Sequence, residues 1–82
     1  MNEIRRLRED SGMSQFAAAR AANIERTRLA LAEHNHVSLS QEQDARLRAV
    51  LLRAIRARRD RLNALLVEMN RQPVVEGVAL TT

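Results

Sequence analysis

The sequence "SQFAAARAANIERTRLALAEHN", residues 14–35, decides the fold. Alanine and aliphatic residues recur in it at spacings of three and four, which is typical of short amphipathic helices. Asn23 interrupts this pattern near the middle, and asparagine is one of the few residues other than glycine that tolerate a positive φ. The stretch therefore predicts two short helices joined by a tight bend. The second of these helices begins with the polar and basic run ERTR, residues 25–28.

Residues on the N-terminal side of this stretch extend the helical pattern. A first helix is expected over about residues 2–10, and Gly12 suits the left-handed conformation that ends many helices. Ser14 is a natural N-cap for the second helix, because its hydroxyl can accept a hydrogen bond from a free backbone N–H of the first turn. Within the second helix, Phe16, either Ala17 or Ala18, and Ala21 are expected to lie in the core.

The third helix is expected over residues 25–33, and a fourth helix follows a second polar stretch. Ser40 and Gln43 form a capping box, in which each side chain bonds to the backbone N–H of the other residue. No glycine or proline follows until Pro73. If this segment is unbroken to residue 72, it is about 45–50 Å long at 1.5 Å per residue. The expected fold class is all-α, since good helix formers dominate before Pro73.

The composition limits the classes of function. The chain has 82 residues, which suits one small domain, and without cysteine it can form neither a disulfide nor a thiolate metal site. No apolar run approaches the roughly 18 residues that a membrane span needs, and the charged N-terminus lacks the apolar core of a signal peptide. We therefore expect a cytoplasmic protein. The net charge of +4 fits a nucleic-acid partner, although a GC-rich coding sequence would also explain the many arginines.

The fourth helix carries an apolar stripe that is longer than the preceding residues can cover. Leucine and isoleucine recur on one face at 100° per residue. The distal half of the stripe therefore needs another partner, and the simplest partner is a second copy of the chain. The expected dimer interface consists of Leu51, Ile55, Leu62, Leu65, Leu66 and Met69. Arg58 also lies in the stripe, and its charged end is expected to reach solvent.

A set of residues at fixed spacing resembles a known family. The set consists of Ser14-Gln15, Ala18-Ala19, Asn23, Ile24, residues 25–28, Leu29 and Glu33. With Arg8 in the first helix, their order resembles the Cro and phage-repressor type (lambda-repressor-like, Xre) of helix-turn-helix domain, and the resemblance covers residues 4–52. Asn23 and Asn35 stand where the family often has glycine, and Leu31 stands where it often has a polar residue.

The resemblance implies that the third helix enters a DNA major groove, where arginine, glutamate, threonine and apolar side chains can each contact base edges. The side chains expected to contact bases are Glu25, Arg26, Thr27, Arg28 and Leu31. Those expected to contact the DNA backbone are Ser14, Gln15, His36, Ser38 and Ser40. Arg8 and Glu33 are expected to form a structural ion pair.

Several of these roles have alternatives that the sequence leaves open. Arg26 and Arg28 could each be a solvated charge, and Gln15 could be a solvent-exposed side chain at a helix start. Glu25 could stabilise the N-terminus of the third helix as an anion instead of contacting cytosine. Leu31 could pack within the protein instead of touching a thymine methyl group.

The chain is expected to divide into three parts. Residues 1–52 form a helix-turn-helix DNA-binding domain, and residues 53–72 extend the fourth helix for dimerisation, which differs from the two short closing helices usual in the family. Residues 73–82 form a tail that is either a short strand or disordered.

The leading hypothesis is a sequence-specific transcriptional regulator of double-stranded DNA, namely a homodimeric repressor of a phage or mobile-element operon. It would bind an inverted repeat with half-sites about 34 Å apart. One alternative is an antitoxin that binds DNA and neutralises a toxin through residues 74–80, and another is a protein-interaction adaptor without a DNA role. No enzyme activity, cofactor or small-molecule ligand is expected, and His34 and His36 are too few to predict a metal site.

Overall fold

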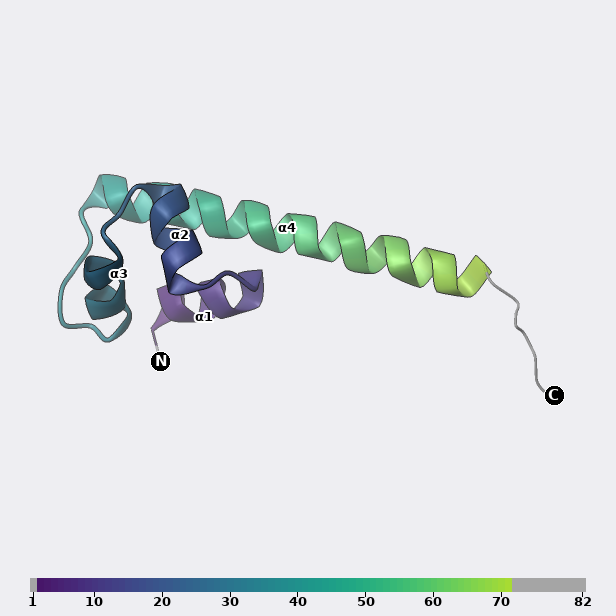
Figure 1. The fold of residues 1–82 in the computed structure, drawn as a ribbon, viewed down its shortest axis with the longest axis horizontal. Helices are drawn as coiled ribbons and strands as arrows, with labels where there is room; N and C mark the ends of the chain where they lie inside the picture. The colour runs from purple at the N-terminus through teal and green to yellow at the C-terminus, as the bar shows by residue number, and fades with distance from the viewer. Residues whose placement is uncertain (1, 72–82) are drawn as a thin grey trace.

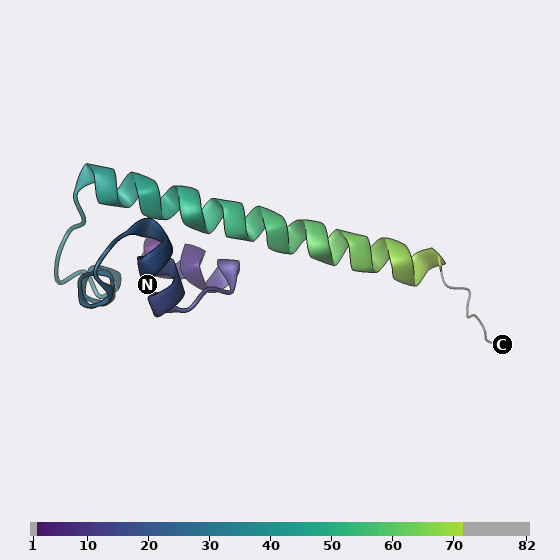
Figure 2. The same cartoon turned by 45° about the horizontal axis from the view of Figure 1, so that its top comes forward.

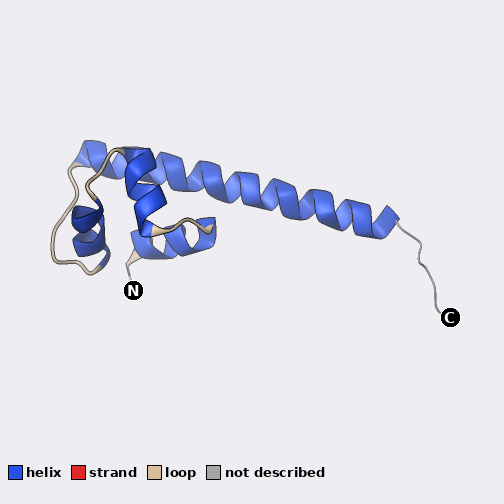
Figure 3. Cartoon of the chain, in the orientation of Figure 1, coloured by secondary structure: helices blue, strands red, loops and turns tan. Residues whose placement is uncertain are grey.

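The computed structural model describes residues 2–71, which form four helices and their connecting loops (Figures 1 and 3). The helices are α1 (Glu3–Ser11), α2 (Gln15–Ala22), α3 (Arg26–Glu33) and α4 (Gln41–Arg71). The all-α prediction is confirmed for this part of the chain, and α4 is uninterrupted. The predicted tail at residues 73–82 lies outside the described residues.

Three left-handed residues end or connect the short helices where the sequence predicts them. Gly12 follows α1 with a φ of 78°, and its N–H bonds to the carbonyl of Glu9. Asn23 follows α2 with a φ of 57°, and Asn35 has a φ of 62° in the loop after α3. Asparagine therefore provides the positive φ that glycine would otherwise supply at these two turns.

Side-chain caps set the starts of two helices. The Ser14 hydroxyl accepts a hydrogen bond from the backbone N–H of Ala17 at 3.0 Å, which fixes the first turn of α2. Ser40 and Gln43 form the predicted capping box, because each side chain accepts from the backbone N–H of the other residue at 3.1 Å. Both caps satisfy donors that a helix start leaves without a partner.

The core lies between α2, α3 and the N-terminal half of α4. Its large side chains are Leu29, Leu47 and Leu51, which are fully buried. Each contributes about 1.5–3 kcal/mol relative to an exposed position. Around them lie the buried residues Ala18, Ala19, Ala22 and Ile24, and Ile4, Leu7, Met13, Leu39 and Val50 pack against the outside of this cluster.

The prediction that Phe16 and Ala21 are buried is wrong. Phe16 is 56% exposed, and Ala21 is also exposed. The buried face of α2 is a row of alanines, and these small side chains let the helix approach α4 closely. Phe16 lies about a third of a turn away from that row, so it points outward. A phenyl ring within the row would force the two helices apart.

α4 belongs to the packed unit only along its N-terminal half (Figures 1 and 2). Leu51 is fully buried against the preceding helices, which corrects its assignment to the dimer interface. Ile55 is half-buried, and every described residue after it is exposed. α1 and α2 both pack against α4, and they end before its distal half begins. No described helix combines the length and the apolar character that crossing a bilayer requires.

Two arginines of α4 bond to the carboxyl-terminal ends of earlier helices. Arg46 Nε donates to the carbonyl of Ala22 at 2.9 Å, at the end of α2. Arg58 Nη1 donates to the carbonyl of Asp10 at 3.0 Å, near the end of α1. Helix ends leave carbonyls unpaired and carry partial negative charge, so both contacts stabilise the fold.

Candidate nucleic-acid interface

The C-terminal end of α3 is fixed to α1 and α2 by polar side chains. Arg8 Nε and Nη2 donate to the two carboxylate oxygens of Glu33 at 2.7 and 3.1 Å. Gln15 Nε2 donates to the same carboxylate at 3.1 Å. The Glu33 side chain is 1% exposed and that of Arg8 is 15% exposed. The structure thus contains the ion pair predicted from the sequence, and Gln15 braces it.

These hydrogen bonds determine the charge state of the pair. Burial acts to raise the pKa of Glu33, but the hydrogen bonds from Arg8 and Gln15, together with the positive charges of Arg8 and Arg5, outweigh it, so the pKa lies below its usual value. The hydrogen bond to Glu33 holds the pKa of Arg8 above its usual value. Both groups are therefore charged at neutral pH. Losing one partner would leave the other as an uncompensated buried charge.

Asn2 adds a second connection between α1 and the end of α3. Its Nδ2 donates to the carbonyl of Ala32 at 2.7 Å and to Oδ1 of Asn35 at 3.1 Å. Its Oδ1 accepts from the backbone N–H of Arg5 and so caps α1. One asparagine side chain thus links the start of α1 to the loop that follows α3.

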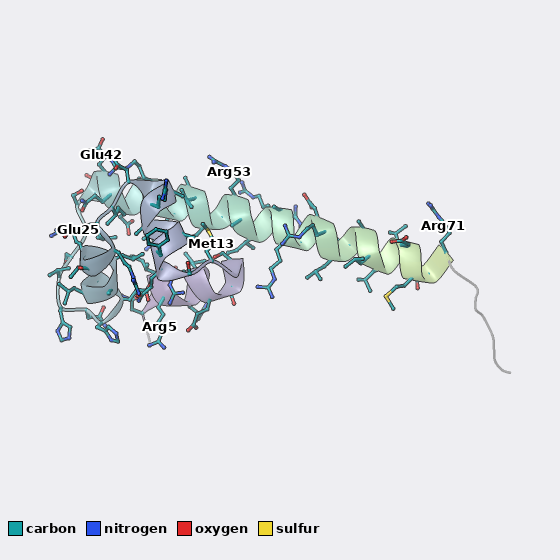
Figure 4. The ribbon with its side chains drawn as sticks, viewed as in Figure 1. Arg5, Met13, Glu25, Glu42, Arg53 and Arg71 are labelled. Carbon is teal, nitrogen blue, oxygen red and sulfur yellow. The ribbon has the colours of Figure 1, made fainter. Side chains whose placement is uncertain are left out.

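The N-terminal end of α3 is exposed. Glu25 is the N-cap residue, but its carboxylate makes no capping hydrogen bond with the backbone. Its side chain lies at the end of the molecule opposite to Arg71 (Figure 4). Arg26 and Thr27 are exposed, and neither side chain hydrogen-bonds to another residue between positions 2 and 71. Leu31 is 39% exposed and follows Thr27 by four residues, so the two share the outer face of α3.

Arg28 has a different environment from Arg26. Its Nε donates to Oε1 of Gln43 at 3.2 Å, and its Nη2 donates to the carbonyl of Ser38 at 3.0 Å. The same Gln43 oxygen accepts the backbone N–H of Ser40. Arg28 therefore connects α3 to the start of α4, and a base contact would have to use its remaining donors.

The side chains expected at the DNA backbone lie in two groups. Ser14 and Ser40 are exposed at the starts of α2 and α4, and their hydroxyl oxygens accept the capping bonds. A hydroxyl that accepts in this way can still donate its proton to a phosphate oxygen. His36 and Ser38 are exposed in the loop after α3. Gln15 points inward to Glu33, as described above, and is half-buried.

The exposed start of α3 offers the chemistry that base recognition in a major groove uses. Arg26 can donate to O6 and N7 of guanine, and Thr27 can donate or accept. Glu25 can accept from the amino group of cytosine, and Leu31 can contact a thymine methyl group. Within residues 2–71, no group of three or more ligand-type side chains is placed to hold a metal ion, and the rings of His34 and His36 lie 6.2 Å apart.

The long-range contacts of Arg28, Arg46 and Arg58 were missed by sequence reasoning. The capping box identified Gln43, but nothing near it in the sequence indicates that Arg28 would bond to it from 15 residues away. Arg46 and Arg58 lie in a helix with arginines on all sides, so their sequence positions do not distinguish them from solvated neighbours.

Comparisons of the chain with protein-family models, with curated proteins and with solved structures find no match. Functional inference therefore depends on the residues and geometry described above.

Proposed function

We propose that the protein is a cytoplasmic, sequence-specific DNA-binding transcriptional regulator of the Cro and phage-repressor type, acting as a homodimeric repressor of a phage or mobile-element operon. The observation that carries this proposal is the contrast between the two ends of α3. Its C-terminal end is fixed by the buried Glu33, and its N-terminal end exposes Glu25, Arg26 and Thr27.

This contrast suits groove recognition for a physical reason. Base-edge contacts discriminate only when the side chains are presented on a rigid element in a fixed orientation. The ion pair and Asn2 hold α3 against α1, and Arg28 holds it against α4. The net charge of +4 adds attraction to the phosphate backbone, which supports affinity without selecting a sequence.

Repression would follow from occupancy of a promoter. Two copies related by a twofold axis bind an inverted repeat, because each copy presents the same side chains to its own half-site. Thr27 and Leu31 on the outer face would face the bases, with Arg26 beside them. The exposed hydroxyls of Ser14 and Ser40 would bond to phosphates.

Selection of bound sequences from a random pool of duplex DNA tests this proposal. We expect enrichment of an inverted repeat, which would demonstrate both base recognition and twofold symmetry. Binding should also weaken with salt: if six phosphates are neutralised, log K should fall with log salt with a slope of about −5. A pool without enrichment, together with binding that does not depend on salt, would refute the proposal.

A further inference from the structure

The distal half of α4 carries an apolar surface that the rest of the described chain does not cover. Leu62, Leu65, Leu66 and Met69 are between 52% and 67% exposed. Beside Leu62 and Leu65 lies a surface groove of about 400 Å³, also lined by Arg58, Arg61, Ala64 and Glu68. These leucines share the face of α4 that, nearer its start, buries Leu47 and Leu51.

Two opposite charges lie along one edge of this groove. Arg61 and Glu68 are seven residues apart, which places them two helical turns apart on the same side of α4. They are too distant along the helix to pair with each other. Both are exposed, and neither forms an ion pair with any residue in the described range 2–71.

We propose that this surface binds the same segment of a second copy of the chain, with the two helices antiparallel. In a heptad pattern, positions a and d face the partner helix and form the seam between the two helices. Leu62 and Met69 occupy position a, and Arg58 and Leu65 occupy position d. An antiparallel pair then places Leu62 against Leu65 of the partner subunit. The same alignment places Arg61 beside Glu68 of the partner subunit, and symmetry repeats the pairing at the other end.

The charges of α4 favour this direction over the parallel one. In a parallel pair, each residue of the seam meets its own copy, so Arg58 would lie directly against Arg58 of the partner subunit. Two guanidinium groups in a seam repel each other, and Arg61 and Glu68 would have no opposite charge beside them. In the antiparallel pair, Arg58 lies against Met69 of the partner subunit. Its guanidinium group can keep its bond to Asp10, while its stem contributes to the seam.

The short length of the seam limits the expected affinity of the dimer. Four large apolar side chains from each copy form a contact at the low end of specific interfaces, so we expect dissociation at roughly micromolar concentration. Of the six residues that the sequence predicts at the dimer interface, the proposed contact uses Leu62, Leu65, Leu66 and Met69. Leu51 and Ile55 lie nearer the core, and Leu51 is fully buried in it.

The antiparallel arrangement has a consequence that depends on the proposed function. α3 lies beside the start of α4, where Arg28 contacts Gln43. In the antiparallel pair the twofold axis lies between Leu62 and Leu65, about 20 residues from Gln43 on each helix. At 1.5 Å per residue, the two Gln43 positions therefore lie roughly 60 Å apart. This distance is nearer to two turns of B-DNA than to one. The half-sites of the operator should then be about two turns apart, rather than the single turn that a compact dimer would use.

The first experiment measures mass by light scattering or sedimentation equilibrium over about 1–500 μM, without DNA. We expect a monomer–dimer equilibrium, and the double variant Leu62→Arg with Leu65→Arg should be monomeric throughout. Val67→Arg is the matched control, because Val67 is 55% exposed but lies on the opposite side of α4. A wild-type chain that stays monomeric at all concentrations would overturn the proposal, and so would a double variant that still dimerises.

The second experiment tests direction by charge reversal. Arg61→Glu and Glu68→Arg should each raise the dimer dissociation constant roughly tenfold, because each places like charges together at both ends of the seam. The chain that carries both changes should recover wild-type dimerisation. Single variants without an effect, or a combined variant without recovery, would refute the antiparallel pairing. Because neither measurement uses DNA, failure here is distinguishable from failure of the DNA-binding proposal.

Discussion

The two halves of α4 have nearly the same amino-acid pattern but different environments. Leu51 and Leu62 lie on one side of the same helix, yet Leu51 is fully buried and Leu62 is 52% exposed. The difference comes from what packs beside them, because α1 and α2 extend only along the first half (Figure 1). An apolar stripe on a helix shows which face will be buried, but the preceding chain determines how much of it becomes core.

The two regions also differ in how polar side chains are used. In the N-terminal unit, residues 2–55, Arg8 bonds to a buried carboxylate and Arg46 bonds to a backbone carbonyl of another helix. In the distal half, residues 56–71, most charges extend into solvent, and the ion pair of Arg59 with Asp60 is exposed. Buried pairs lose a great deal when one partner is removed, whereas exposed pairs lose little. The following predictions test this contrast.

The largest effect should come from Arg8→Ala. Removing this guanidinium leaves the Glu33 carboxylate buried without its counter-ion, so we expect a loss of about 3–5 kcal/mol in the free energy of unfolding. Urea denaturation followed by circular dichroism measures it. Arg5→Ala is the matched control, because Arg5 pairs with the exposed Glu9 at 3.3 Å and should cost less than about 1 kcal/mol. Equal losses in the two variants would show that burial of Glu33 does not dominate the stability.

The next effect compares adjacent leucines. Leu51→Ala should cost about 2–5 kcal/mol, because it opens a cavity in the core. Leu52→Ala should change stability by only about 0.5 kcal/mol, because Leu52 is 41% exposed. Both variants raise the helix propensity of α4 slightly and by the same amount, because alanine is a stronger helix former than leucine, so the difference between their denaturation midpoints reports burial. A loss for Leu52→Ala as large as that for Leu51→Ala would contradict the position of the core.

Local features of the fold could be predicted from the sequence, whereas contacts across the fold could not. Gly12, Asn23 and the pairing of Ser40 with Gln43 depend on a few neighbouring residues whose conformational preferences are strong. The error at Phe16 has the opposite origin. Aromatic residues are usually buried, but the alanine row of α2 leaves no room for one, and only the packing of α2 against α4 reveals this.

The candidate site shows the same division. Exposure of Thr27 follows from the helical pattern, because Thr27 lies on the side of α3 opposite to the buried Leu29. Arg26 precedes Leu29 by three residues and shares its side, so its exposure comes from its place in the first turn, outside the packed core. The bonds of Arg28 depend on where the loop after α3 brings Ser38 and Gln43. That path is set by tertiary packing, and the sequence around Arg28 contains no sign of it.

The third prediction distinguishes Arg26 from Arg28 by the effect of each side chain on DNA affinity and on stability. Arg26→Ala and Thr27→Ala should each weaken binding to the selected operator by about 1–3 kcal/mol, with little change on random duplex DNA and none in stability. Arg28→Ala should lower the unfolding free energy as well, because it removes the bonds between α3 and α4. Fluorescence anisotropy on both duplexes measures binding. Equal losses for Arg26→Ala on operator and random DNA would mean that Arg26 does not contact bases.

A fourth prediction uses acid to probe the buried pair. The pKa of Glu33 in the folded protein lies below the ordinary value of 4.5. On acidification, Glu33 therefore takes up a proton more readily in the unfolded chain than in the folded protein. Stability from this group is therefore present above pH 4.5 and is lost as the pH falls through the folded value. In Glu33→Gln the unfolding free energy should be lower and should depend less on pH in this range. Glu9→Gln, at an exposed site, should lower the unfolding free energy at neutral pH by less than Glu33→Gln does.

The smallest effect should come from Arg58, whose guanidinium group bonds from the distal half of α4 to the end of α1. Arg58→Met removes one hydrogen bond at a helix end, so the N-terminal unit should lose about 0.5–1 kcal/mol when measured at a concentration low enough to keep the chain monomeric. Arg56→Met, at an exposed position, should have no such effect. The dimer should instead become tighter, because Arg58→Met replaces a charge in the seam with an apolar side chain. If Arg58→Met weakened both the folding of the N-terminal unit and the dimer, the two halves of α4 would not be energetically separate. The division into a packed unit and a docking surface would then be wrong.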